Sequence, residues 1–133
     1  MINYVVDTDV VSYGFRQDTR FDYYRPLLQG NRAFVSFMTV AELDFWQSSR
    51  NWGPRRRQQL AAYVGQHFAM YPVTRKLCSL WANVTLDAQR KGRVLRCADA
   101  WIAATALRLN APLMTNNIKD FELLDGIQVI APA

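Results

Sequence analysis

The chain has 133 residues, 50% of them hydrophobic, and a formal net charge of +5 at pH 7. This length suits one domain spanning residues 1–133, and the apolar content allows a core without disulfide or metal staples. The basic balance favours a polyanion, such as nucleic acid, as a partner. The apolar run at the N-terminus is far too short for a signal peptide or a membrane span, so we expect a cytoplasmic protein with no membrane partner.

Two cysteines and one histidine limit the possible chemistry. Cys78 and Cys97 do not form a CxxC pair, and in a reducing compartment we expect both to be buried thiols. His67 lies near the end of a predicted helix, where its side chain can hydrogen-bond to the last backbone carbonyl groups of that helix. A zinc site built from several histidines is therefore excluded, and a Ser-His-Asp triad would have to use His67.

Short apolar runs bounded by polar or turn residues predict buried parallel strands over residues 4–6, 33–37, 112–115 and 127–130. Pro54 and the helical spacing of later apolar side chains predict a helix from Pro54 to Ala69. Two more helices are expected, over residues 77–88 and over residues 98–109, the second ending at Asn110. Residues 48–57 are expected to form a basic surface loop between two helices. Strands alternating with helices indicate an α/β sandwich.

Acidic residues directly after predicted strands are the first candidates for a site, because ligands of open α/β sheets gather at the carboxyl ends of the strands. Asp7 ends the first strand, and Asp9 follows two residues later. An aspartate in this position is also a common helix cap, which binds a backbone N–H through its side-chain oxygen. Asp7 taken alone fits both interpretations.

Glu42 and Asp99 have the same two interpretations. Glu42 comes shortly after the second predicted strand, and together with Thr39 it also matches a capping box, in which the glutamate bonds back to the cap's N–H. Asp99 opens the last long helix, where the helix dipole favours a carboxylate without any function.

Asn117 and Asp120 follow the third predicted strand, although two adjacent asparagines also make an ordinary turn. Because several such groups follow strands, one shared site is the simpler explanation. Two carboxylates about 4 Å apart repel by roughly 4 kcal/mol at an effective dielectric near 20, so a converging cluster needs a cation. Oxygen ligands suit Mg²⁺ or Mn²⁺, which can turn water into a nucleophile against a phosphodiester. An acidic pocket in a basic protein therefore indicates phosphodiester cleavage.

Four segments resemble, in order, the landmark motifs of the PIN-domain family and, within it, the VapC ribonucleases: residues 5–10, 36–43, 99–106 and 115–121. The resemblance spans nearly the whole chain. It implies a three-layer α/β/α sandwich with a mostly parallel central sheet and a Mg²⁺-dependent endoribonuclease, often acting on structured RNA such as tRNA. It also implies a cognate VapB-like antitoxin, toxin–antitoxin function and a homodimer.

The same resemblance assigns the site. Three residues match the family's core acids and would be both catalytic and metal-binding: Asp7, Glu42 and Asp99. Asn117 stands where the family frequently has aspartate, and Asp120 is a nearby substitute for that fourth acid. Asp9 departs from the family, which more often has asparagine or serine there, so its extra charge would alter the metal site.

Phosphate contacts supply affinity for RNA but do not discriminate between base sequences. Basic residues near these motifs are candidates for such contacts: Arg93, Arg96, Arg55, Arg56 and Arg57. A solvated surface that keeps the protein soluble explains them equally well. The four tryptophans are expected in the core or at a dimer contact rather than as stacking platforms for bases.

Two other functions stay open at this point. The segment around Asp7 also fits a haloacid-dehalogenase-like phosphohydrolase, in which Asp7 would be the covalent nucleophile, but the downstream lysine and the later acidic motif of that family are not clear here. The chain could also be a non-catalytic RNA-binding domain whose metal site has decayed, as Asn117 would allow.

Overall fold

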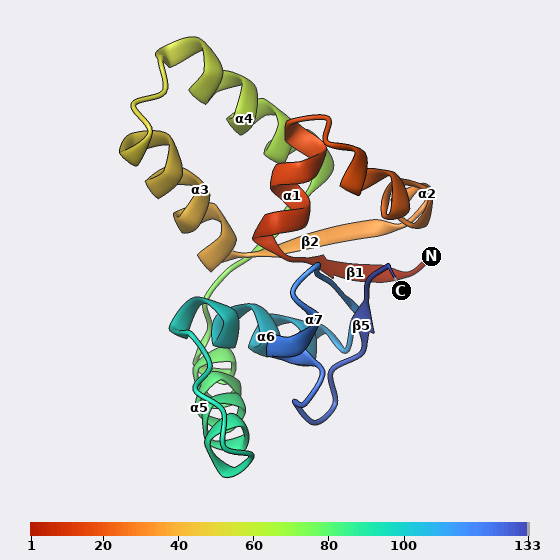
Figure 1. The fold of residues 1–133 in the computed structure, drawn as a ribbon, viewed down its shortest axis with the longest axis vertical. Helices are drawn as coiled ribbons and strands as arrows, with labels where there is room; N and C mark the ends of the chain where they lie inside the picture. Colours follow the sequence, from red (N-terminus) through yellow and green to blue (C-terminus); the bar gives the residue numbers. More distant parts are fainter. Residues whose placement is uncertain (133) are drawn as a thin grey trace.

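The computed structural model describes residues 1–132 as a central β-sheet with helices on both faces (Figure 1). Its elements, in chain order, are β1 (Asn3–Val6), α1 (Thr8–Phe15), the 3₁₀ helix η1 (Thr19–Tyr23), α2 (Arg25–Leu28), β2 (Arg32–Ser36), α3 (Phe37–Ser49), α4 (Pro54–His67), β3 (Ala69–Tyr71), α5 (Arg75–Arg90), α6 (Cys97–Leu109), β4 (Leu113–Met114), α7 (Ile118–Phe121) and β5 (Val129–Ile130).

The described sheet has five parallel strands in the order β3-β2-β1-β4-β5. β1 lies in the middle, with Tyr4 opposite Ala33 of β2 and Val5 opposite Leu113 of β4. β2 pairs with one side of β1, β3 pairs with the outer side of β2, and β4 pairs with the other side of β1. The strand order therefore reverses between β1 and β4, where open α/β sheets bind ligands at the carboxyl ends.

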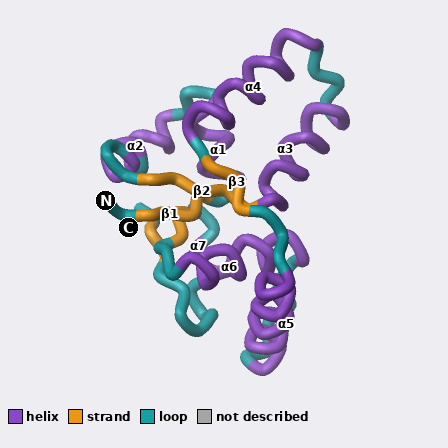
Figure 2. The backbone as a smooth tube through the Cα atoms, turned by 180° about the vertical axis from the view of Figure 1, so that it is seen from behind, coloured by secondary structure: helices purple, strands orange, loops and turns teal. Residues whose placement is uncertain are grey.

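Alternating side chains of the strands face two separate cores, as the pleat of a strand requires. Tyr4 and Val6 of β1 pack with side chains of α1, η1, α3 and α4, whereas Val5 packs with α5, α6 and α7. Figure 2 shows the strands between these two groups of helices. The predicted three-layer α/β/α sandwich with a parallel sheet is confirmed.

The predicted helix from Pro54 is confirmed at its start and wrong at its end. α4 stops at His67, and the next residue, Phe68, is extended at φ −132° and ψ 150°. Ala69 then pairs with Phe34 of β2 as the first residue of β3. Three strand residues, two of them exposed, are too few to show a strand period in the sequence.

The other two predicted helices are confirmed as α5 and α6, and Asn110 ends α6 in the left-handed conformation at φ 49° and ψ 46°. The expected loop over residues 48–57 is too long, because α3 runs to Ser49 and α4 begins at Pro54. Proline's fixed φ suits the first helical position, so the arginines that follow Pro54 belong to a helix and not to a loop.

The cysteines are free, as expected, but both are exposed, so the prediction of buried thiols is wrong. On α5 the buried positions are Leu77, Val84 and Ala88. Cys78 is one residue past Leu77, which turns it about 100° away from that buried stripe. Cys97 is the first residue of α6.

Within residues 1–132, the structure contains no helix with the length and apolar character needed to cross a membrane.

Candidate active site

The carboxyl ends of β1, β2 and β4 deliver polar residues to one edge of the sheet. Asp7 directly follows β1, Ser36 is the last residue of β2, and Thr115 directly follows β4. All three side chains are buried, with exposures of 6%, 0% and 0%. Because β1 is paired with β2 on one side and β4 on the other, Asp7 lies at the centre of this edge.

Asp7 is a buried carboxyl group held at both oxygens. Its Oδ1 accepts the backbone N–H of Thr8 at 2.7 Å, which caps α1, and its Oδ2 accepts the hydroxyl of Thr115 at 2.6 Å. Burial, helped by the charges of Asp9 and Asp99, raises the pKa of Asp7 to about 8. Asp7 is thus the helix cap that the sequence allowed and also a strongly perturbed acid at the carboxyl edge of the sheet.

Asp9 ties α1 to the loop after β4. Its Oδ2 accepts the backbone N–H of Asn116 at 3.1 Å, and the Asn116 side-chain oxygen accepts the hydroxyl of the fully buried Tyr24 at 3.1 Å. Burial raises the pKa of Asp9, and the charge of Asp99 raises it further. The extra acid noted in the sequence is therefore part of the same electrostatic cluster as Asp7.

Glu42 reaches this cluster through Thr8. The Thr8 hydroxyl donates to Glu42 Oε1 at 2.8 Å and lies 2.9 Å from the hydroxyl of the buried Thr39. The capping box of Thr39 and Glu42 is wrong, because α3 begins three residues earlier than it requires and its N-cap is Ser36, whose Oγ accepts the N–H of Met38. The strand runs straight into the helix, so the cap falls on the last strand residue.

Asp99 is paired with Arg96, the N-cap residue of the same helix, α6. It lies in the first turn of α6, as predicted, and is 2% exposed. The guanidinium of Arg96 donates from Nε to Oδ2 at 3.0 Å and from Nη2 to Oδ1 at 3.1 Å. Its hydrogen bond to Asp99 raises the pKa of Arg96, and the charges of Glu42 and Asp7 raise it further. Arg96 is therefore within electrostatic reach of three acids.

Asn117 and Asp120 lie at the start of α7. The Asn117 backbone N–H donates to the Thr115 hydroxyl at 3.0 Å, which links this segment to Asp7. The Asn117 side-chain amide donates to Asp120, and Arg93 donates to the other Asp120 oxygen at 3.1 Å. Both carboxylate oxygens of Asp120 thus accept a hydrogen bond, one from Asn117 and one from Arg93.

The structure brings Asp7, Asp9 and Asp99 close enough for their charges to act on one another. Among residues 1–132, no three acidic, histidine or cysteine side chains are already gathered as a metal-binding group. Each buried acid is instead held by neutral donors or, at Asp99, by the cation Arg96. Carboxylate oxygens are the donors that Mg²⁺ and Mn²⁺ prefer, and a cation already stands at Asp99, so the residues present fit a divalent ion.

The three arginines at the start of α4 differ in their contacts. Arg57 donates to the backbone oxygens of Trp52 and Gln47, which ties α4 to the end of α3. Arg56 lies over the ring of Trp52, with its guanidinium carbon 3.9 Å from the ring centre. Arg55 is exposed. Arg57 has therefore a structural role that the sequence did not predict.

Sequence reasoning missed the neutral residues that hold the acids in place. These donors are the hydroxyls of Thr8 and Thr115 and the backbone N–H of Asn116. Thr8 directly follows Asp7, Thr115 directly follows β4, and Asn116 comes next, so their places just after strand ends are the signal that could have found them.

Comparisons with known proteins agree with this fold. The model of the PIN domain family matches residues 4–127. Ribonuclease VapC1 of Haemophilus influenzae is 31% identical over an alignment of 133 positions, which includes 94% of each chain. Two solved structures share the fold: VapBC2 from Rickettsia felis bound to a DNA fragment from their promoter, and VapBC-5 from Mycobacterium tuberculosis, described as a member of the VapBC family of toxin-antitoxin systems.

The Rickettsia chain has a TM-score of 0.86 at 21% identity and covers 99% of this chain and 100% of its own. The Mycobacterium chain has a TM-score of 0.73 at 24% identity, with 99% and 100% covered. The chain therefore belongs to the PIN-domain family and, within it, to the VapC group.

Proposed function

We propose that this protein is a metal-dependent endoribonuclease and the toxin of a toxin–antitoxin pair. The observation that carries the proposal is the buried Asp7 at the carboxyl end of β1, where the strand order reverses between β1 and β4. Burial and the charges of Asp9 and Asp99 raise its pKa to about 8. A clustered set of acids with perturbed pKa values in such a crevice is typical of a catalytic site. The relationship to proteins named ribonuclease VapC supports RNA as the substrate.

The residues that would hold Mg²⁺ or Mn²⁺ are Asp7, Glu42 and Asp99. When bound, the ion supplies a water made nucleophilic and neutralises charge on the phosphodiester. The Thr8 N–H and the Thr115 hydroxyl hold the Asp7 carboxylate in a fixed orientation. The Thr8 hydroxyl holds one oxygen of the half-buried Glu42, and the second oxygen would orient water.

The proposed reaction is hydrolysis of one phosphodiester bond. The water oxygen bonds to phosphorus, the bond from phosphorus to one ribose oxygen breaks, and that oxygen takes up a proton. Glu42 would accept the proton that the attacking water loses. Asn117 and Asp120 stay candidates for the fourth acidic position, with Asp120 held by Arg93.

The proposed substrate is structured RNA such as tRNA. Candidate phosphate contacts are Arg93 and Arg96 beside the acids and Arg55, Arg56 and Arg57 on α4. Arg96 would exchange Asp99 for a phosphate, which its 68% exposed side chain allows. Arg57 would keep its hydrogen bonds to the end of α3, so it would attract the RNA through its positive charge without a direct phosphate contact.

The proposed partners are a VapB-like antitoxin and a second copy of the chain. The likeness to chains of VapBC complexes supports the antitoxin. Light scattering of the purified protein tests the dimer, and co-purification with the product of the neighbouring reading frame tests the antitoxin.

A phosphohydrolase with Asp7 as nucleophile is less well supported. Both Asp7 oxygens accept a hydrogen bond, and the side chain is 6% exposed, so attack on a phosphate would have to break buried contacts. Labelled RNA and a phosphate-ester dye, each with and without Mg²⁺, separate the candidates. We expect Mg²⁺-dependent cleavage of RNA alone. Turnover of the dye alone would favour the phosphohydrolase, and binding of RNA without cleavage would favour a non-catalytic domain.

A further inference from the structure

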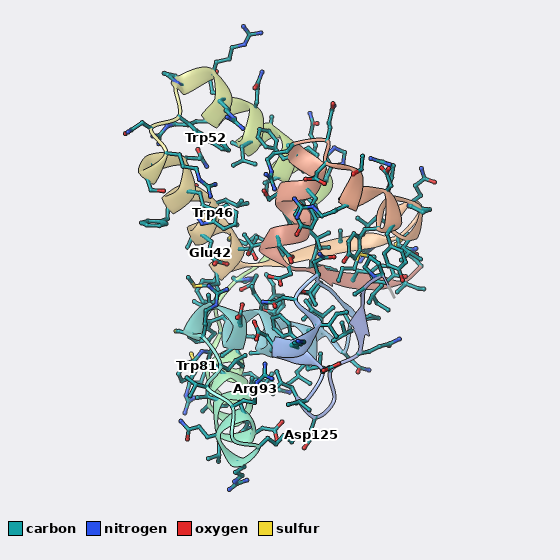
Figure 3. All side chains as sticks on the ribbon, viewed as in Figure 1. Glu42, Trp46, Trp52, Trp81, Arg93 and Asp125 are labelled. Carbon is teal, nitrogen blue, oxygen red and sulfur yellow. The ribbon has the colours of Figure 1, made fainter. Side chains whose placement is uncertain are left out.

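A small cleft lies between α1, α3 and the start of α4. The hydrogen bond from Thr8 of α1 to Glu42 of α3 lies nearer the acids, and the cleft is lined further along both helices. Residues four apart on a helix lie on one face, so Trp46 and Arg50 continue the face of Glu42 along α3. Figure 3 shows Glu42 at the lower end of α3 with Trp46 further along the same helix. At 1.5 Å per residue, Arg50 lies about 12 Å from Glu42 along the axis.

The facing wall comes from α1 by the same spacing. Ser12 and Arg16 follow Thr8 at four-residue intervals and line the cleft opposite Trp46 and Arg50. Trp52, after the end of α3, closes the far end of the cleft and stacks against a phenylalanine of α1. The buried Leu43 and Leu60 also line it, so the cleft is apolar inside and basic and aromatic at its rim.

Arg16 and Arg50 line this cleft, and Arg56 lies beside it on the ring of Trp52. Arg16, Arg50 and Arg56 are exposed, and none of them forms a salt bridge within residues 1–132. Two of them lie instead on indole rings: Arg50 lies 5.1 Å from the ring centre of Trp46, and Arg56 lies 3.9 Å from that of Trp52. Three unpaired cations beside two aromatic rings suit a polyanion that carries flat rings.

The shape of the cleft decides how such a ligand could be held. Its open volume is about 20 Å³, room for about one water molecule. No base can be buried in it, so contact must be made along the rim. Proteins hold unpaired nucleic acid in this way, with arginines on phosphates and bases stacked on aromatic or guanidinium planes.

We propose that this cleft holds an unpaired stretch of the RNA next to the cleavage site. Arg16 and Arg50 contact its phosphates, and the stacked pair of Arg50 and Trp46 presents a plane to one base. Trp46 packs against the core, as expected of the tryptophans, and its half-buried ring would also serve the RNA at the rim. The proposal rests on the proposed ribonuclease function.

The test measures binding of a short unpaired RNA of mixed sequence in EDTA, where cleavage is switched off. Arg16→Gln and Arg50→Gln should each weaken binding and lower the log-log salt slope by about 0.7, the value for one phosphate contact on a single strand. Arg108→Gln, an exposed arginine on α6 across the sheet, is the matched control and should bind as wild type does. With Mg²⁺ present, the two cleft variants should raise KM and leave kcat unchanged.

Tryptophan fluorescence locates the contact. RNA should change the emission of the wild type, this change should shrink in Trp46→Phe, and it should persist in Trp81→Phe, whose indole lies against α6. Unchanged affinity and salt slope in both arginine variants would overturn the proposal. So would a fluorescence response to polyglutamate without one to RNA, which would assign the cleft to an acidic protein segment.

Failure of this proposal and failure of the proposed function give different results. Cleft variants that bind and cleave RNA as the wild type does would refute the cleft and leave the ribonuclease intact. A wild type that neither binds nor cleaves RNA would refute both.

Discussion

Arg96 pairs with both carboxylate oxygens of Asp99, at 3.0 Å and 3.1 Å, across one turn at the start of α6. The acid side chain is 3% exposed and the arginine side chain 68% exposed. A buried carboxylate needs a nearby cation, and here the cation can leave for solvent without breaking a packed core. Arg96 and a divalent ion would therefore compete for the same two oxygens.

Arg96→Gln is expected to weaken the metal-free protein and strengthen its response to metal. Loss of the charged donor leaves Asp99 buried without a cation, which should cost about 1 to 3 kcal/mol of unfolding free energy. Mn²⁺ should then raise the melting temperature more than in the wild type, because no arginine has to be displaced. Calorimetry with and without Mn²⁺ measures both effects. An equal metal-induced rise in the two proteins would show that Arg96 does not compete for the ion.

The pH dependence of stability should report Asp7. Its pKa is about 8 in the folded protein against an ordinary value of 3.8, so the folded state holds this proton more tightly than the unfolded state does. The stability from Asp7 is fully present below about pH 4 and is lost as the pH rises to about 8. In EDTA, Asp7→Asn should therefore melt higher than the wild type at pH 8, with a gap that closes toward pH 4. Parallel melting curves across this range would contradict the shifted pKa.

Glu42→Gln and Ser36→Ala should give opposite patterns. The Thr8 hydroxyl can still donate to a glutamine oxygen, so Glu42→Gln should change stability by about 0.5 kcal/mol or less and abolish cleavage. Ser36→Ala removes the cap of α3 and should cost about 1 kcal/mol while most of the cleavage rate remains. Melting and RNA cleavage are measured for both variants. A fully active Glu42→Gln protein would remove Glu42 from the site.

Thr115→Val should move metal binding to higher pH. The Thr115 hydroxyl donates to Asp7 and lowers its pKa, so its loss should make Asp7 harder to ionise. Mn²⁺ titrations at several pH values should show the affinity rising at higher pH than in the wild type. Thr115→Ser keeps the hydroxyl and serves as the control. If the valine and serine variants bind Mn²⁺ with the same pH profile, the hydroxyl does not tune Asp7.

The acids could be predicted from the sequence because their positions follow from strand ends. Asp7 directly follows the three-residue apolar run of β1, and parallel strands bring such residues to one edge. Asp99 was predicted from the helix pattern of α6 and its place in the motif. Both residues are also ordinary helix-terminal acids, so the sequence could not decide their role until burial and mutual charge were known.

The residues that the sequence did not place depend on contacts between distant segments. β3 is stabilised by pairing with β2, which a three-residue run does not reveal. Arg57 binds backbone oxygens of the preceding helix end, and Arg96 turns toward Asp99 rather than toward solvent. A charge count describes all arginines alike, and the partner of each is fixed only when the chain folds.

The central claim is that Asp7 and Asp99 hold the metal ion with which this protein cleaves RNA. The most direct measurement follows cleavage of labelled RNA by wild type, Asp7→Asn, Asp99→Asn and the control Arg108→Gln over a Mg²⁺ titration, with EDTA as the zero point. We expect wild type and Arg108→Gln to cleave only with Mg²⁺, and both aspartate variants to lose about 100-fold or more. Cleavage at full rate in EDTA, or by either aspartate variant, would contradict the account.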